Sequence, residues 1–221
     1  MESNEIQTGE AHLTTAAEAI LKAAEKLFAT KGLDLVSTRE IARAAGQKNH
    51  SALQYHFGDR HELIDAILDY RMIPLNQRRL EMLVVIENAG QTHNVRELVS
   101  ALVLPFVSEI SKAPEDSYYI SLMSQLFTRH QAHIVFNGDK SRASGLWSII
   151  DYLAGSLGLS VEERLARMTF IGTQIVHTLA GWDHLRRTQP ELMTNEILMV
   201  RTEWLISFLE GALLSKPPVE T

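Results

Sequence analysis

The sequence predicts an all-α protein with two parts, an N-terminal domain that contains a helix-turn-helix and a larger C-terminal helical domain. Apolar residues recur at intervals of three and four along most of the chain, which is the period of an amphipathic helix. Residues 74–221 contain no run of alternating polar and apolar residues, the pattern of a half-buried strand. Near the N-terminus, residues 37–57 are typical of two short helices joined by a glycine-containing turn.

The first helix of this pair begins at Ser37. Ser37 and Glu40 have the spacing of a capping box, in which each side chain accepts a hydrogen bond from the other residue's backbone amide. Gly46 is expected to end this helix, because glycine readily adopts the left-handed conformation found after a helix C-terminus. After a polar turn, Asn49 is the candidate N-cap of the second helix.

The second helix has one apolar and one polar face. Leu53 and Phe57 lie one turn apart, so we expect both to be buried. The opposite face carries His50, Ser51, Gln54 and Tyr55. Their imidazole, hydroxyl and amide groups are donors and acceptors of the kind that contact base edges and phosphates. The second helix is therefore the candidate recognition helix.

An amphipathic helix is predicted to precede this pair. Residues 1–13 are expected to form a flexible tail. Thr15 and Glu18 then have capping-box spacing, and apolar residues follow at helical intervals as far as Gly32. This helix supplies the apolar face on which the helix-turn-helix is expected to pack.

A fourth helix is predicted from Asp59 to about residue 71, with a capping box formed by Asp59 and Glu62. Pro74 follows, and because the residue before a proline disfavours the helical conformation, we expect a hinge there. The predicted domains are therefore a helix-turn-helix domain at 1–73 and a second helical domain at 74–221.

Six helices are predicted in the second domain, separated by glycine, proline and polar residues. Pro105 is expected to kink one of them, and Ser160 with Glu163 is expected to cap another. They span about residues 75–88, 94–106, 115–135, 140–157, 160–187 and 191–214.

Composition limits the class of protein. The 221 residues are 45% hydrophobic, which is enough for a sizeable core, and the absence of cysteine excludes disulfides and thiolate metal sites. The chain opens with polar and acidic residues, whereas a secretory signal needs a basic start and an apolar run. No apolar stretch approaches the ~20 residues that span a bilayer. We therefore expect a soluble, cytoplasmic protein without a membrane partner.

Charge is distributed unevenly along the chain. The net charge is −6, but residues 37–60 hold four basic residues against two acidic ones, a local charge of +2 that leaves −8 on the remainder. An acidic body with a basic helix-turn-helix would orient the protein on a DNA duplex. The same distribution is also explained by the ordinary need for solubility.

At these residues the sequence resembles the TetR family of bacterial transcriptional repressors, and the resemblance covers roughly the first 70 residues. The matching positions are Ala23, Ala24, Leu27, Phe28, Gly32, Thr38, Ile41, Ala42, Ala45, Gly46, the run Leu53-Gln54-Tyr55-His56-Phe57, Arg60 and Leu63. Two features depart from the family pattern. The Gln47-Lys48 turn is one residue longer than usual, and Gln54 replaces the first aromatic of the family's frequent Leu-Tyr-Tyr-His-Phe ending.

The resemblance implies a double-stranded DNA operator as partner. Residues near the N-terminus of a recognition helix reach base edges in the major groove, so His50, Ser51 and Gln54 are the candidate base readers. A bidentate contact from Gln54 to adenine would typically contribute ~1–3 kcal/mol of discrimination. The candidate phosphate contacts are Thr38, Lys48, Tyr55 and Arg60, of which the resemblance supports Thr38, Tyr55 and Arg60. The alternative role for Tyr55 and His56 is to pack between helices.

The last two predicted helices are candidates for a homodimer interface. In the penultimate helix, apolar and small residues recur at intervals of four and three, which is typical of a helix-packing seam. The last helix is apolar on two faces and so needs two partners. The predicted interface residues are Met168, Gly172, Ile175, Leu179, Trp182, Val200, Trp204 and Phe208. The family resemblance implies the same four-helix contact, while a fully buried central helix in a monomer is the alternative.

The resemblance also implies a pocket for a small-molecule effector in the second domain, and sites of this kind commonly lie between helices. The candidate lining residues are Phe106, Tyr119, Met123, Phe127, Trp147, Phe170 and His177. Each of these residues has plain core packing as its alternative role. Few charged residues fall at interior positions, so we expect a mainly apolar ligand.

Other functions lack the residues that they require. His130 with His133, and His177 with His184 around Asp183, have metal-ligand spacing, but nothing completes either set, so no metal or cofactor is expected. No nucleophile elbow or glycine-rich phosphate loop is present, so we expect no enzyme. We interpret the chain as a repressor released from its operator by the ligand. A helical module whose helix-turn-helix packs against another protein is the alternative.

Overall fold

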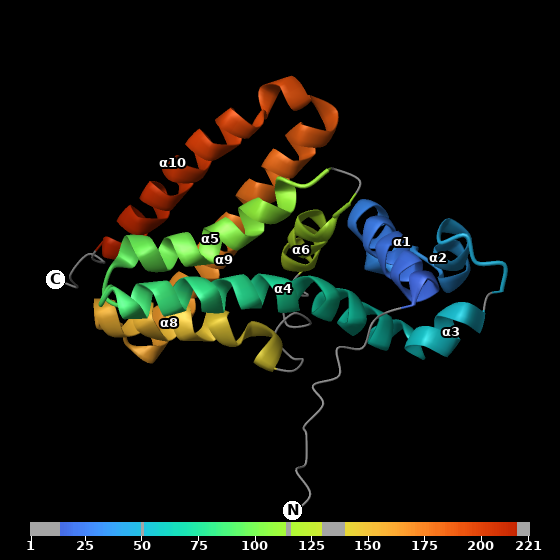
Figure 1. Ribbon diagram of the computed structural model, residues 1–221, viewed down its shortest axis with the longest axis horizontal. Coiled ribbons are helices and arrows are strands. Elements are labelled where there is room, and N and C mark those ends of the chain that lie inside the picture. Colours follow the sequence, from blue (N-terminus) through green and yellow to red (C-terminus); the bar gives the residue numbers. More distant parts are fainter. Residues whose placement is uncertain (1–13, 50, 114–115, 130–139, 216–221) are drawn as a thin grey trace, which may run out of the picture.

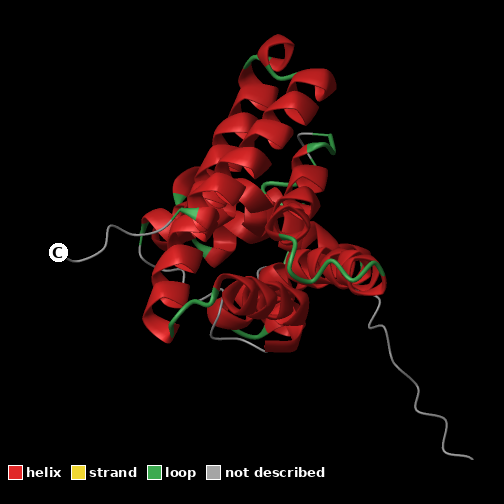
Figure 2. Cartoon of the chain, turned by 90° about the vertical axis from the view of Figure 1, so that its left-hand side faces the viewer, coloured by secondary structure: helices red, strands yellow, loops and turns green. Residues whose placement is uncertain are grey.

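The computed structural model describes residues 14–49, 51–113, 116–129 and 140–215. Within these ranges the chain consists of helices joined by turns and loops, and it contains no strand (Figure 2). The predicted all-α fold class is confirmed.

The N-terminal helices gather at one end of the molecule (Figure 1). They are α1 (Thr15–Lys31), the 3₁₀ turn η1 (Leu33–Leu35), α2 (Thr38–Ala44) and α3 (Ser51–Phe57). Ser37 caps α2 as predicted, because its hydroxyl accepts a hydrogen bond from the Glu40 amide at 3.2 Å. The cap of α1 is Thr14 and not Thr15, since the Thr14 hydroxyl accepts from the Ala17 amide at 3.2 Å.

The fourth helix, α4 (Arg60–Asn88), is one continuous helix of 29 residues with Pro74 inside it. Its capping box of Asp59 and Glu62 is confirmed, but the predicted end near residue 71 and the separate helix at 75–88 are wrong. A proline inside a helix removes one hydrogen bond. Buried side chains on both sides of the proline, including Met72 and Leu75, hold the helix together across that gap. The predicted domain boundary thus falls within α4, which runs from the helix-turn-helix deep into the second domain (Figure 1).

The remaining helices form a bundle around the second half of α4. They are α5 (Val95–Ile110), α6 (Tyr119–Thr128), the 3₁₀ turn η2 (Lys140–Ala143), α8 (Ser144–Leu157), α9 (Val161–Thr188), the 3₁₀ turn η3 (Pro190–Leu192) and α10 (Asn195–Leu214). Helices α5 and α8 lie along α4, and α9 returns through η3 into α10, which packs on α5 (Figure 1).

Most predicted helices in this region are found, with shifted ends. The capping box of Ser160 and Glu163 is confirmed. The last helix starts at Asn195 and not near residue 191, because Pro190–Leu192 form a 3₁₀ turn and Thr194 provides the cap. Parts of the helix predicted at 115–135, and the tail predicted at 1–13, lie outside the described residues.

The packing of α8 against α4 depends on a glycine. The Gly145 amide donates a hydrogen bond to Asn76 Oδ1 at 2.7 Å, and a Cβ atom at position 145 would lie only 3.0 Å from the Cβ atom of Arg79. Helix α8 therefore lies directly on the turn of α4 that carries Arg79.

Candidate nucleic-acid interface and ligand cavity

Helix α3 presents the polar face expected of a recognition helix. Leu53 and Phe57 are buried against the other N-terminal helices, whereas Ser51, Gln54 and Tyr55 are exposed. Tyr55 is 85% exposed, and its ring meets only the edge of the neighbouring imidazole, at a centroid distance of 5.1 Å. The tyrosine is therefore free to reach a partner outside the chain. His50, the third candidate base reader, lies outside the described residues.

The N-terminus of α3 is held by Asn49. Its Oδ1 atom accepts hydrogen bonds from the Ser51 amide at 3.0 Å and from the Ser51 hydroxyl at 2.5 Å. In the longer turn before it, Gly46 has a positive φ of 69°, and the Gln47 amide returns to the Ala42 carbonyl at 2.9 Å. The inserted turn is thus closed by backbone and side-chain hydrogen bonds, which fix the start of α3.

Three of the four predicted phosphate contacts are exposed, and one is not placed as predicted. Thr38 at the start of α2, Lys48 in the turn and Tyr55 on α3 all face solvent. The guanidinium group of Arg60 instead turns inward. It donates hydrogen bonds to the carbonyls of Val36, at 2.6 Å, and Leu33, and its carbon atom lies 4.9 Å from the centroid of the Phe28 ring. In this conformation Arg60 fastens η1 to α4, so its predicted phosphate role is not supported.

Two further basic residues are exposed near the candidate DNA-contacting residues of α2 and α3. Arg39 and Arg43 are exposed on α2 and form no ion pair with any residue in the described ranges. The nearest acidic residue in sequence, Glu40, is paired with Lys31. Both arginines contribute to the local positive charge of residues 37–60, but no sequence pattern assigns either one a contact. They are the second and sixth residues of α2, off the positions of its buried residues Ile41 and Ala42, and this spacing is the sequence signal for their exposure.

A mainly apolar cavity lies within the second domain and encloses about 80 Å³ of free space. Four predicted pocket residues line it, namely Phe106, Tyr119, Met123 and Phe127. The other lining residues come from α4, α5, α8 and α9 and are Met72, Arg79, Leu102, Leu146, Ile150, Met168, Ile171, Gly172, Ile175 and Val176.

Three predicted pocket residues do not line the cavity. Phe170 is 70% exposed, because the inward face of α9 at this level is occupied by the next residue, Ile171. His177 is exposed, with Nδ1 2.9 Å from the Ser124 hydroxyl oxygen. Trp147 is half-buried on α8 beside the lining residue Leu146.

The predicted seam of α9 lies inside the chain. Met168, Gly172 and Ile175 line the cavity, and Leu179 is fully buried within the chain, where α9 packs on α5 and α6. A residue with no exposed surface contributes no area to a dimer interface, so the assignment of Leu179 was wrong. The internal and intermolecular seams of a helix have the same spacing in sequence.

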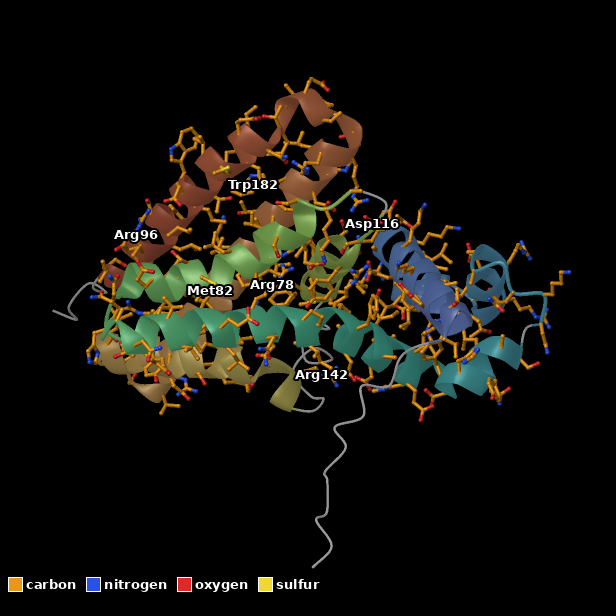
Figure 3. All side chains as sticks on the ribbon, viewed as in Figure 1. Arg78, Met82, Arg96, Asp116, Arg142 and Trp182 are labelled. Atoms are coloured by element: carbon orange, nitrogen blue, oxygen red, sulfur yellow. The ribbon has the colours of Figure 1, made fainter. Side chains whose placement is uncertain are left out.

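The other predicted interface residues lie on an outer surface formed by α9 and α10. Trp182, labelled in Figure 3, is half-buried and borders the same surface groove as Trp204 and Phe208. Trp204 is 68% exposed, and Phe208 and Val200 are also exposed. The outer face of α10 is therefore strongly apolar.

One charged residue, Arg79, lines the cavity, and it is not among the residues predicted from sequence. Arg79 is only 3% exposed, and its Nε and Nη2 atoms have no hydrogen-bond partner. Its guanidinium carbon lies 4.8 Å from the centroid of the Phe106 ring. Burial lowers the pKa of Arg79 to about 10, which still leaves the group charged at neutral pH. The sequence signal for its burial is helical spacing. Arg79 lies seven residues after Met72 and four before Leu83, which places all three on the buried face of α4.

A buried ion-pair cluster joins the helix-turn-helix to the second domain. Arg71 of α4 binds Glu25 of α1 through two hydrogen bonds of 2.6 and 3.0 Å, and it lies 3.6 Å from Glu109 of α5. Arg71 also donates to the Asp116 carbonyl at 2.7 Å, and Glu25 accepts from the Tyr118 amide at 2.5 Å. Figure 3 shows Asp116 in the loop next to α1. Helices α1, α4 and α5 and this loop are thus tied together at one point.

No three histidine, aspartate or glutamate side chains in the described part of the chain are arranged to hold a metal ion. Asp183 is buried and bound to Arg187 and Ser121, at 2.9 and 3.1 Å. His130 and His133 lie outside the described residues. None of the described helices is long and apolar enough to span a membrane.

Comparison with known proteins agrees with this architecture. Residues 20–67 match the sequence model of the family described as bacterial regulatory proteins, tetR family. The HTH-type transcriptional repressor Rv3405c of Mycobacterium tuberculosis (strain ATCC 25618 / H37Rv) is 34% identical over 169 residues, which cover 69% of this chain and 88% of that protein. The HTH-type transcriptional regulator Mb3439c of Mycobacterium bovis (strain ATCC BAA-935 / AF2122/97) matches to the same extent.

Two solved structures share the fold along most of the chain. An alanine-substituted mutant of HlyIIR has a TM-score of 0.51 and 18% identity, and the match covers 98% of this chain and 100% of that one. NalD, the secondary repressor of the MexAB-OprM multidrug efflux pump in Pseudomonas aeruginosa, has a TM-score of 0.51 and 19% identity, with coverage of 89% and 96%. The chain belongs to the TetR family and is a helix-turn-helix, DNA-binding transcriptional regulator.

Proposed function

We propose that the protein is a homodimeric cytoplasmic repressor, released from its operator when a small molecule binds the cavity. The observation that carries this proposal is α4, a single helix that begins at the capping box beside α3 and carries Met72 and Arg79 into the cavity wall. No enzymatic step and no cofactor enter the proposed function.

The DNA contacts follow from the exposed face of α3. His50, Ser51 and Gln54 are proposed to reach base edges in the major groove, and Thr38, Lys48 and Tyr55 to hold phosphates. Exposed Arg39 and Arg43 add positive charge on α2, which favours approach to the duplex. Two copies of α3 separated by about one DNA turn, ~34–36 Å, would occupy successive major grooves.

The homodimer is proposed to form through the outer surface of α9 and α10. Trp204, Phe208 and Val200 are exposed there, and Trp182 lies beside them. Monomers rarely expose a contiguous apolar patch of several large side chains. Because the inner face of α10 already packs on α5, a second copy of the chain is the partner that would cover the outer face.

Release from DNA is proposed to result from movement of α4. A ligand in the cavity contacts α4 directly, and the pairing of Arg71 with Glu25 makes α1 follow any displacement of α4. The resulting change in spacing between the two α3 helices would weaken operator binding. By linkage, DNA must weaken ligand binding by the same coupling free energy.

The proposal is tested by fluorescence anisotropy on DNA from immediately upstream of the gene, against a scrambled duplex, across a salt series. The wild type is expected to bind the upstream DNA tightly, with a salt dependence that reports several phosphate contacts. Gln54→Ala with Tyr55→Ala should abolish this binding but leave the dimer and the helical content unchanged. Gln77→Ala, at an exposed position of α4, is the matched control.

Equal and weak binding of both duplexes would contradict the DNA-reading proposal for this operator. A stable dimer with helical content intact would then favour the alternative, in which the helix-turn-helix packs against another protein.

A further inference from the structure

Arg79 is a buried cation without a counter-ion among the described residues. It sits in the wall of the cavity, 3% exposed, with the Phe106 ring 4.8 Å from its guanidinium carbon. Buried charges in proteins are normally paired and hydrogen-bonded, since an isolated one has lost its hydration without compensation. Two other buried arginines of this chain have carboxylate partners, as Arg71 binds Glu25 and Arg142 pairs with Asp65 and Asp69. Arg142 also has two buried nitrogens without a hydrogen bond, but unlike Arg79 it lies beside two carboxylates.

The unsatisfied atoms of Arg79 define the shape of the missing partner. Nε and Nη2 are both buried and without a hydrogen bond, and their N–H groups point the same way along one edge of the planar guanidinium. Two parallel donors on one edge match the two oxygens of a carboxylate, which is the bidentate arrangement common for arginine.

We propose that the effector is a small carboxylic acid with an apolar body, and that its carboxylate binds the Nε and Nη2 edge of Arg79. This inference rests on the proposed role of the cavity as the effector site.

The other side chains that line the cavity determine which apolar group and which net charge the ligand can have. Apart from Arg79 and the Tyr119 phenol, the lining side chains are apolar, and no second cation of the described chain lines the cavity. A monoanion neutralises Arg79, whereas a phosphate dianion would leave one buried negative charge unpaired. The phenol stays protonated at neutral pH because burial raises the pKa of Tyr119, so it remains a hydrogen-bond donor within the same cavity.

Space in the cavity limits the size of the acid. The free volume is about 80 Å³, enclosed by side chains of α4, α5, α6, α8 and α9. Phe106 stacks on Tyr119 with ring centroids 6.3 Å apart, so one wall is aromatic. A single aromatic ring or a short alkyl chain suits this lining.

The test is isothermal titration calorimetry of the full-length protein with five acids and their primary amides. The acids are benzoate, phenylacetate, 3-phenylpropanoate, hexanoate and octanoate. At least one acid should bind wild-type protein about 10- to 100-fold more tightly than its amide, the difference typical of hydrogen bonds to a charged group. Arg79→Met should abolish that preference. Arg78→Met is the matched control, because Arg78 precedes Arg79 but is exposed and donates to Ser108 (Figure 3).

Far-UV circular dichroism and thermal unfolding establish that each variant is folded. Should Arg79→Met fail to fold, Arg79→Lys takes its place, because lysine keeps the charge but lacks the paired donors and should lose most of the preference. The inference is overturned if no acid binds the wild type, if acids and amides bind equally, or if Arg79→Met keeps the preference for the acid.

An operator-release assay with the same compounds separates this inference from the proposed function. If the amides release the protein from DNA to the same extent as the acids, the carboxylate site is refuted and the repressor proposal stays intact. An acid that binds through Arg79 without any effect on operator affinity would support the carboxylate site and refute ligand-induced release.

Discussion

The buried charge of Arg79 is expected to lower the stability of the fold. Its pKa of about 10 in the folded chain lies well below the ordinary value of a guanidinium group because burial disfavours the charged form. Folding penalises the protonated group, so the whole penalty on stability is present at every pH below this folded pKa. The penalty is relieved only as pH rises above about 10. At neutral pH the whole penalty is present, and it corresponds to roughly 3 kcal/mol at most.

Arg79→Met is therefore expected to raise the free energy of unfolding at pH 7, by up to ~3 kcal/mol, because methionine fills similar space without a buried charge. Urea unfolding followed by circular dichroism measures the change. The exposed Arg78→Met should shift the midpoint by less than about 0.5 kcal/mol. A loss of stability in Arg79→Met would mean that the arginine is compensated in the folded chain, which would contradict the isolated charge.

Helix α4 runs from the helix-turn-helix to the cavity, and its ion-pair cluster ties α4 to α1 and α5. Arg71 lies two turns before Arg79 on the same helix and is bound to Glu25 of α1. Removing one partner of a buried pair leaves the other charge uncompensated, at a typical cost of 3–5 kcal/mol. The cluster is therefore expected to contribute to stability as well as to the proposed coupling of α1 and α4.

Arg71→Met should lower the free energy of unfolding by ~3–5 kcal/mol, because Glu25 remains buried without its cation, whereas Glu109 keeps its ion pair with Lys112. Adding Glu25→Leu is expected to recover part of the loss, and a double-mutant cycle by urea unfolding measures the coupling. Lys22→Met is the control, since the Lys22–Glu18 pair is exposed and worth less than about 1 kcal/mol. Additive effects of Arg71→Met and Glu25→Leu would show that the pair does not couple α1 to α4.

Across the whole molecule, local patterns predicted the elements better than the contacts between them. The capping residues Ser37, Asp59 and Ser160 and the buried faces of α1 and α3 follow from short-range chemistry, which a sequence displays directly. The local effect of Pro74, which is to break helices, predicts a hinge, but packing of its buried neighbours overrides that preference.

Only part of the cavity lining was predicted from the sequence, because the lining also depends on contacts between elements. Phe170 and Ile171 are adjacent and both apolar, so only the rotation of α9 against its neighbours decides which one lines the cavity. Leu179 has the spacing of any helix-packing seam, and the position of α5 and α6 makes that seam internal. By residue type Arg79 does not differ from its exposed neighbour Arg78, and the packing of α4 against α5 and α8 shows which of the two is buried.

The proposed homodimer depends on the outer face of α10. Trp204→Glu with Phe208→Glu places four like charges across a two-fold contact that is expected to bury aromatic rings, so the dimer should dissociate. Sedimentation velocity should show a folded monomer, and operator affinity should fall at least tenfold because each monomer places only one recognition helix in DNA. Val85→Glu is the control, an exposed apolar position on α4 away from this face. A double variant that remains dimeric would refute the α9–α10 interface, and a wild type that sediments as a monomer would refute the homodimer itself.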